Sequence, residues 1–170
     1  MSEPRFSSRL LLGALAGLTA TTVMTAMMRR LHAKLPEEER YPLPPREITE
    51  RISATAVNEN DLRDRSLAAH FVYGAMAGAL IAATGTKHRN AAGAAMGAGV
   101  WIGSYFGWVP ASDILKRADK HPLRRNALMI RVHLVWGAVT TWAIRELAAA
   151  RETIVAEGPL RDAPSLSSHT

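Results

Sequence analysis

The sequence of 170 residues has no cysteine, and this absence excludes disulfides, thiolate metal sites and thiol nucleophiles together. It also has no His-Glu-x-x-His zinc motif, no phosphate-binding P-loop and no Gly-x-Ser-x-Gly nucleophile turn. We therefore expect a protein that is not an enzyme and has no catalytic residue, cofactor or metal. A haem held between His70 and His133 is a weaker alternative, since nothing in the sequence supplies partners for its propionates.

Formal charge is nearly missing from four long stretches of the sequence. They total 81 residues and hold one charge, Arg131, whereas the other 35 charges lie in the remaining 89 residues. A helix of about 20 residues matches the ~30 Å hydrocarbon core of a bilayer. We therefore predict an all-α integral membrane bundle of four transmembrane helices arranged as two hairpins, and we exclude a soluble nucleic-acid binder. The expected spans are Leu10–Met28, Ser66–Thr86, Ala91–Ser112 and Asn126–Ile144.

The segments outside the expected spans are polar. Residues 1–9 are an N-terminal tail, 10–146 are the transmembrane domain with an extramembrane loop at 29–65, and 147–170 are a C-terminal tail expected to be partly disordered. Short surface or interfacial helices are expected at 47–55 and 112–116. Pro110 lacks an amide proton, so we expect it to end or kink the third span.

Lysine and arginine are unequally divided between the two sides of this topology. Residues 1–9, the turn between the second and third spans and residues 145–170 carry 7, whereas the loops 29–65 and 113–125 carry 13. The positive-inside rule then places both loops in the cytoplasm and both termini outside. The basic clusters at span ends are expected to meet lipid headgroups rather than nucleic acid. They are Arg29-Arg30, Lys87-His88-Arg89, Lys116-Arg117 and Arg124-Arg125.

Small residues recur at a spacing of four within the spans and form five Gly-x-x-x-Gly pairs. Lipid provides no hydrophobic drive for helix pairing, so small residues that let backbones approach closely are the expected contact surfaces. The pattern predicts tight packing but does not separate packing within one chain from association with itself or with other membrane-protein subunits. The expected packing residues are Gly13, Gly17, Gly74, Gly78, Gly93, Gly97, Gly99, Gly103, Gly107 and Gly137.

The second and fourth spans share a motif. His70-Phe-Val-Tyr-Gly-Ala75 recurs 63 residues later as His133-Leu-Val-Trp-Gly-Ala138. An offset of two spans and their loop predicts an internal parallel repeat, with both histidines at similar depth on helices that run in the same direction. Each histidine leads a row of small residues at spacing four, so we expect it to face other helices rather than lipid.

Ionisable residues inside spans are functional candidates by default. The candidate polar cluster is His70, Tyr105, Asp113, Arg131 and His133. The competing interpretations are structural: each histidine is a hydrogen-bond partner of a neighbouring helix, and Arg131 extends to the headgroups. The functional interpretation is a polar pocket or a proton-responsive switch, because histidine titrates near pH ~6.5.

Several short motifs occur in an order that resembles the YagU-like inner-membrane proteins of bacteria. They are Gly13-Ala-Leu-Ala-Gly17, Leu43-Pro-Pro-Arg-Glu-Ile48, His70-x-x-Tyr-Gly-Ala75, Gly103-Ser-Tyr-x-Gly-Trp-x-Pro110, Pro122-x-x-Arg-Asn126 and His133-x-Val-Trp-Gly137. The resemblance covers about Leu10 to Glu146. It implies a multipass protein of the bacterial inner membrane, without established catalytic residues and loosely linked to acid tolerance.

Packing motifs outnumber chemical ones in this sequence. The leading hypothesis is therefore a multipass membrane protein that acts through helix packing, either by self-association or as an accessory or structural subunit of a membrane assembly. The alternative is a proton- or solute-responsive channel or transporter that uses His70, His133 and Arg131. A membrane-embedded enzyme is the least favoured of the three, since no nucleophile or metal constellation is evident.

Overall fold

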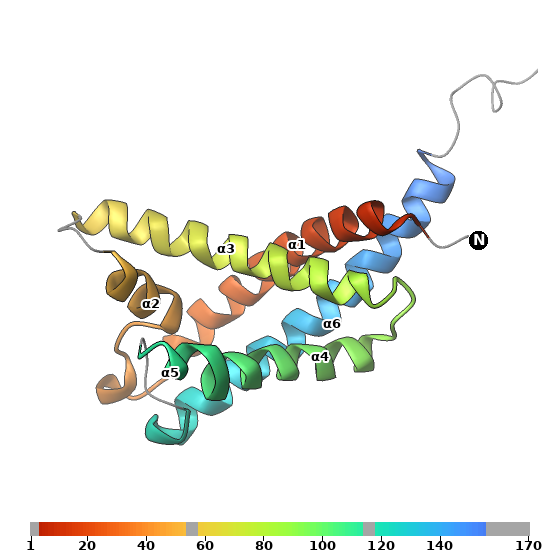
Figure 1. Ribbon diagram of the computed structural model, residues 1–170. Helices are drawn as coiled ribbons and strands as arrows, with labels where there is room; N and C mark the ends of the chain where they lie inside the picture. The colour runs from red at the N-terminus through yellow and green to blue at the C-terminus, as the bar shows by residue number, and fades with distance from the viewer. Residues whose placement is uncertain (1–3, 54–57, 114–117, 156–170) are drawn as a thin grey trace, which may run out of the picture.

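The computed structural model describes residues 4–53, 58–113 and 118–155, and these residues are helical with no β-strand (Figure 1). The elements, in chain order, are α1 (Phe6–His32), η1 (Glu37–Glu39), α2 (Pro44–Ile52), α3 (Glu59–Ala83), α4 (Asn90–Ile102), η2 (Gly103–Trp108), α5 (Val109–Ala111), η3 (Ala118–Lys120) and α6 (Leu123–Thr153).

Three of these helices are long and apolar enough to cross a membrane: α1 with 27 residues, α3 with 25 and α6 with 31. α1 and α6 contain the first and fourth expected spans and extend beyond them at both ends, whereas α3 begins before the second expected span and ends at Ala83, short of its expected end at Thr86. The extensions carry charged side chains, such as Arg29 and Arg30 in the last turn of α1. The structure is therefore that of an all-helical protein suited to a membrane.

The third expected span, 91–112, differs from the other three because it is not one regular helix. α4 ends at Ile102 after 13 residues, a π-helical turn, η2, follows, and the three-residue α5 completes the segment. Gly107 leaves helical geometry, with φ −108° and ψ −112°, and Pro110 follows it closely. Glycine disfavours a helix interior by about 1 kcal/mol and proline by about 3, so this stretch does not hold a continuous α-helix.

The short helices expected outside the spans are described in part. The helix expected at 47–55 forms as α2 and begins earlier, at Pro44, because two prolines are well tolerated in the first turn of a helix. Most of the helix expected at 112–116 lies outside the described residues, and so does most of the C-terminal tail.

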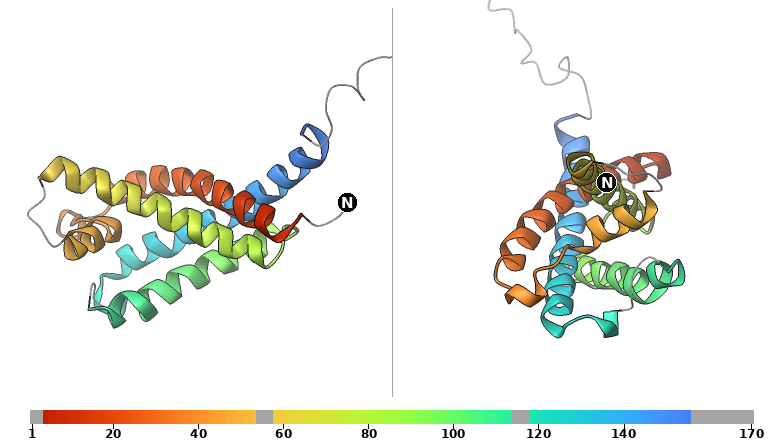
Figure 2. Two further views of the ribbon diagram at one scale, coloured as in Figure 1. Left: turned by 45° about the horizontal axis from the view of Figure 1, so that its top comes forward. Right: turned by 90° about the vertical axis from the view of Figure 1, so that its left-hand side faces the viewer.

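α1 and α4 run in one direction and α3 and α6 in the other (Figures 1 and 2). The closest helix contacts are those of α1 with α3, α4 with α6 and α1 with α6. α3 and α4 are joined by a short turn at 84–89, where Gly85 has φ +138°, which favours glycine. From that turn α3 and α4 diverge, and they do not pack directly along their length.

Glycines bring α1 and α3 together. A Cβ at Gly13 or Gly17 would collide with the backbone of Gly78 or Gly74, and a Cβ at Gly78 would meet the carbonyl of Gly13. The two Gly-x-x-x-Gly pairs therefore interlock within one chain, which allows the backbones to touch.

The same arrangement occurs between α4 and α6. A Cβ at Gly93 would meet Thr141 and the carbonyl of Gly137, and one at Gly97 would meet the carbonyl of His133. Gly74 and Gly137 occupy the same position of the repeated motif, and each lies against the glycine-rich helix that precedes it. Gly99, Gly103 and Gly107 differ, because a Cβ at any of them would have open space.

Candidate ligand-binding cavity

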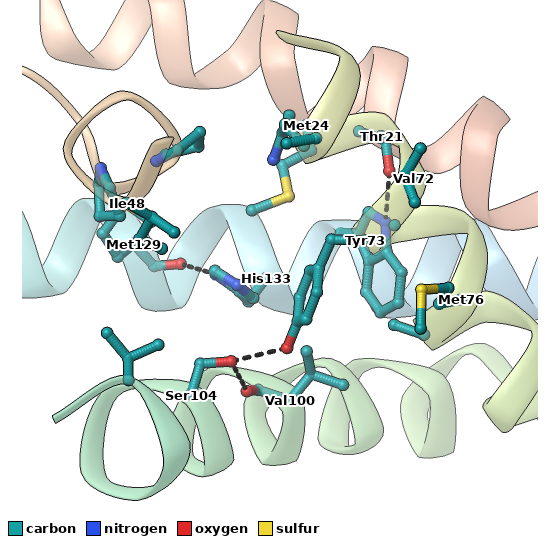
Figure 3. A pocket seen from close by; sticks show the side chains of 18 of the residues that line it. Thr21, Met24, Ile48, Val72, Tyr73, Met76, Val100, Ser104, Met129 and His133 are labelled. Atoms are coloured by element: carbon teal, nitrogen blue, oxygen red, sulfur yellow. Dashed lines mark hydrogen bonds between the residues drawn. The ribbon is translucent and has the colours of Figure 1, made fainter. Parts of the chain in front are cut away.

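A cavity of about 340 Å³ lies where α3 and α4 diverge, with α1, α2 and α6 completing its walls (Figure 3). Its lining is apolar apart from the imidazoles of His70 and His133, the hydroxyls of Thr21, Thr49, Tyr73, Ser104 and Tyr105, and the indoles of Trp108 and Trp136. None of the lining residues carries a formal charge. The volume and composition match the small-molecule sites of proteins, which are mostly apolar clefts of about 300–1,000 Å³ with few polar groups.

His133 enters the cavity from α6 and is 8% exposed. Its Nδ1 lies 2.7 Å from the carbonyl oxygen of Met129, one turn earlier in the same helix. A carbonyl oxygen only accepts, so Nδ1 carries the proton and the neutral ring leaves a lone pair on Nε2. The backbone of α6 thus sets the tautomer of this imidazole.

His70 lines the same cavity from α3. Its Nε2 is buried and has no hydrogen-bond partner among the described residues. An unpaired buried polar atom costs about 1–3 kcal/mol. The unpaired nitrogen is therefore a group that a bound molecule would satisfy.

Tyr73 connects the two diverging helices across the cavity. Its hydroxyl lies 2.8 Å from Oγ of Ser104, and Ser104 donates to the carbonyl of Val100 at 2.8 Å (Figure 3). Serine has one hydroxyl proton, so Tyr73 is the donor in the first bond. The phenol oxygen keeps a lone pair that can accept a hydrogen bond.

Trp136 and Thr21 form the inner wall, where α6 meets α1. The indole N–H donates to Oγ1 of Thr21 at 3.1 Å, and Thr21 donates to the carbonyl of Gly17 at 2.7 Å. Thr21 is 0% and Trp136 2% exposed. The indole N–H of Trp136 and the hydroxyl proton of Thr21 are therefore both hydrogen-bonded within the fold.

The cavity reaches the outer surface of the bundle between α3 and α4. Four large lining residues are exposed, Val72 by 58%, Met76 by 62%, Trp108 by 44% and Tyr73 by 38%, and so is the smaller Ala69. A second groove continues from Tyr73 and Trp108 toward Leu80 and Thr84. The surface around this opening is largely apolar.

α2 covers the other end of the cavity with Pro44, Pro45, Ile48 and Thr49. Arg125, at the start of α6, holds the loop that leads into α2. It is 4% exposed and donates to the carbonyl oxygens of Glu39, Tyr41 and Pro42 at 2.8–3.1 Å. The buried guanidinium of Arg125 thus holds the loop backbone that positions α2 at this end of the cavity.

Two further groups surround this guanidinium. It stacks 3.4 Å over the Tyr41 ring, and a carboxylate oxygen of Glu47 lies 3.8 Å away. Burial raises the pKa of the Glu47 carboxyl above its ordinary value, although the positive charge of Arg125 acts in the opposite direction. Burial also raises the pKa of Tyr41, whose hydroxyl lies 3.1 Å from Nδ1 of His121.

The structure brings together three of the five residues of the expected polar cluster. His70, Tyr105 and His133 line the cavity. Arg131 is exposed on the outside of α6, and Asp113 is exposed beyond α5 with φ +53°. Six residues separate Arg131 from Arg125, which is about one and two-thirds helical turns, so the two arginines point in different directions.

Sequence reasoning missed Tyr73, Ser104 and Arg125 as site residues. The prediction that Arg125, like Arg124, meets lipid headgroups is wrong, because the side chain of Arg125 is buried against loop carbonyls. Its neighbour Arg124 is exposed. The repeated motif contained a signal for Tyr73, which occupies the same motif position as Trp136.

Among the described residues, no group of three or more His, Cys, Asp or Glu side chains is placed to hold a metal ion. No family model matches the chain, and no curated protein or solved structure matches it either. The geometry therefore defines the site. It is an apolar cavity with a lone pair on Nε2 of His133, an unpaired nitrogen on His70 and an opening between α3 and α4.

Proposed function

We propose that this protein is a multipass membrane protein that binds a small apolar molecule in the cavity between α3 and α4. The observation that carries the proposal is the pair of imidazoles, His70 and His133, that face one uncharged cavity from different helices. A polar group inside a membrane bundle is costly and is kept where it has a role. The opening between α3 and α4, beside Val72 and Met76, would admit a molecule directly from the lipid.

The proposal includes a fourth membrane crossing. In it, α4, η2 and α5 cross the bilayer together, so that α1 with α3 and α4 with α6 form two hairpins. The continuous run from Asn90 to Ala111 and the close packing of α4 on α6 support this arrangement. Irregular backbone at membrane depth is tolerated where it lines a cavity, and η2 contributes Ser104, Tyr105 and Trp108 to this one.

In the same proposal, the membrane is the bacterial inner membrane. The loops 29–65 and 113–125 are cytoplasmic and both termini lie outside, following the distribution of lysine and arginine. α2 would then cover the cavity from the cytoplasmic side, and the opening between α3 and α4 would lie within the bilayer.

Tryptophan fluorescence tests binding. The protein is reconstituted in lipid nanodiscs and titrated with 1-bromodecane, whose bromine quenches indoles at short range. Trp108 and Trp136 line the cavity, so binding predicts a saturable component of quenching above the linear component from bromodecane in the lipid.

Two matched variants locate the binding. Ala69 lines the cavity and Ala68 does not, and both are exposed on α3. Ala69→Phe is expected to reduce the saturable component, whereas Ala68→Phe is expected to retain it. A purely linear titration of the wild-type protein, or equal saturation in both variants, would overturn the proposal.

Self-association is a second candidate function. The observation that favours it is the open space at Gly99 and Gly103, in contrast to the glycines that are occupied by neighbours within the chain. A second copy or another subunit would pack against this face of α4, which would make the protein an accessory or structural subunit. Nanodisc-free native mass spectrometry of the wild-type and Gly103→Leu proteins tests this: a dimer lost in the variant supports it, and a monomer in both contradicts it.

A proton- or solute-responsive transporter remains a weaker proposal. It rests on His70 and His133, and it no longer includes Arg131, because that side chain lies on the outside of α6. Acid-survival assays of a His70→Ala, His133→Ala double variant test this reading, and survival equal to wild type would reject it.

A further inference from the structure

The polar groups of the cavity differ in what they can offer a ligand, and this difference defines the ligand's chemistry. The inference rests on the proposed binding function. It follows from assigning each proton of the cavity's hydrogen bonds, because a group that has already donated can only accept.

Three hydroxyl or indole donors in or beside the cavity are already used. Thr21 donates to the Gly17 carbonyl, Ser104 to the Val100 carbonyl and Trp136 to Thr21. Since Ser104 has no second proton, Tyr73 must donate to it. Each of these side chains therefore presents no free O–H or N–H to a ligand.

The groups that remain include two acceptors. Nε2 of His133 has a lone pair, because Nδ1 donates to the Met129 carbonyl at 2.7 Å. The phenol oxygen of Tyr73 also has a lone pair, because its own proton is donated to Ser104. No hydrogen bond among the described residues fixes the tautomer of His70, and its buried Nε2 has no partner there.

We infer that the cavity selects an apolar alcohol or phenol: a molecule with a hydrocarbon body and one hydroxyl group. The hydroxyl proton is donated to Nε2 of His133, and the hydroxyl oxygen accepts from His70 when its Nε2 is protonated. An ether or a ketone of the same shape leaves the His133 lone pair unpaired. A hydrocarbon leaves both imidazoles unpaired, and a carboxylate or ammonium head would be buried without a counter-charge.

The volume and lining of the cavity also fit the hydrocarbon part of such an alcohol or phenol. A cavity of about 340 Å³ holds a short alkyl chain or a single ring with a chain, and its walls of methionine, valine, proline and aromatic side chains match such a body. The lateral opening beside Val72 and Met76 lets the chain extend into the lipid while the hydroxyl stays between the two imidazoles.

Three probes with one body test the inference: 4-octylphenol, its methyl ether 4-octylanisole, and octylbenzene. Each competes with 1-bromodecane for the saturable tryptophan quenching of the wild-type protein in nanodiscs, with concentrations expressed as mole fractions in the lipid. We expect 4-octylphenol to bind at least about tenfold more tightly than either of the others, because a site that pairs a hydroxyl discriminates against analogues without it.

The outcomes separate this inference from the proposed function. Equal displacement by all three probes would keep the binding function and overturn the selection for a hydroxyl group. Failure of bromodecane to show any saturable quenching would overturn the binding function itself. Both results come from the wild-type protein, so they do not depend on a variant that folds.

A variant then assigns the selection to His133. His133→Leu is expected to bring the affinity for 4-octylphenol to within about twofold of that for 4-octylanisole. The control is His88→Leu, in the turn after α3 and outside the cavity lining, where the tenfold preference is expected to remain. A folded His133→Leu protein with the full preference would overturn the role of this lone pair.

Discussion

Arg125 lies with its guanidinium 3.4 Å over the ring of Tyr41 and donates to the carbonyl oxygen of the same residue at 2.8 Å. The contact joins the start of α6 to a loop residue 84 positions earlier. Only arginine has both the planar face for stacking and several donors in a fixed fork. The relationship explains how the short loop between η1 and α2 holds α2 over the cavity.

Replacing Arg125 should destabilise the fold. Arg125→Gln leaves loop carbonyls without their donor and removes the stacking, with an expected loss of about 2–4 kcal/mol. Arg125→Lys should recover only part of this, because an ammonium group cannot reach three carbonyls while stacking on a ring. Thermal unfolding in one detergent measures both, and Arg124→Gln is the control because Arg124 is exposed. Equal melting temperatures for the Arg124 and Arg125 variants would contradict this role.

Glycine substitutions should separate packed from open positions. Gly17→Ala places a methyl group against the backbone of Gly74, and such overpacking costs about 1–3 kcal/mol. Gly103→Ala meets nothing within 4 Å, so the better helix propensity of alanine makes it neutral or stabilising by up to about 1 kcal/mol. Melting temperatures in lipid nanodiscs should therefore fall for the first variant and not for the second.

The Glu47 carboxyl should give the protein a measurable pH dependence. Burial raises its pKa in the folded state above 4.5, so the folded protein holds this proton more tightly than the unfolded chain. The stability contributed by Glu47 is therefore complete below pH 4.5 and declines as the pH rises through the raised pKa. Glu47→Gln removes this decline, so the melting temperature of the variant relative to wild type should increase from pH 4 toward neutrality.

A control variant accompanies the Glu47 experiment. Glu50→Gln removes a carboxylate from the same helix at an exposed position, and its difference from wild type should vary less with pH. A Glu47→Gln protein whose relative melting temperature falls toward neutral pH would show that the attraction of Arg125 outweighs burial.

Asp113 should tolerate only residues that accept a left-handed backbone. Its φ of +53° is the one positive value for a residue other than glycine in the described part of the chain. Asp113→Val is expected to lower stability by about 1–2 kcal/mol, because a β-branched residue is strained at this φ. Asp113→Gly should be neutral or slightly stabilising, and denaturation curves that show the two variants to be equally stable would refute the backbone explanation.

The sequence predicted the long helices well because their signal is local. Leu10–Met28 holds no charge and Asn126–Ile144 holds only Arg131, each for about the length of a bilayer crossing, and α1 and α6 contain these ranges. The third range was harder to predict, since it is as apolar as the others but contains Gly103, Gly107 and Pro110. Hydropathy predicts that a segment is apolar, whereas backbone preferences decide whether it is one helix.

The candidate site was predictable in part. The repeated motif placed His70 and His133 at similar depth, and both line the cavity. It did not show that one imidazole would be tied to Met129 and the other left with an unpaired nitrogen. Nor did it separate Arg125 from Arg131, because the direction of a side chain depends on how the helix is rotated against its neighbours.

The sequence by itself determined which segments are apolar, where small residues permit close approach and which helices carry the histidines. These properties follow from residue type and spacing along one helix. Only the tertiary structure decided that three glycine pairs are used within the chain while Gly99 and Gly103 face open space. It also decided that α3 and α4 diverge around a cavity, because the tight α1–α3 and α4–α6 contacts hold the two helices apart.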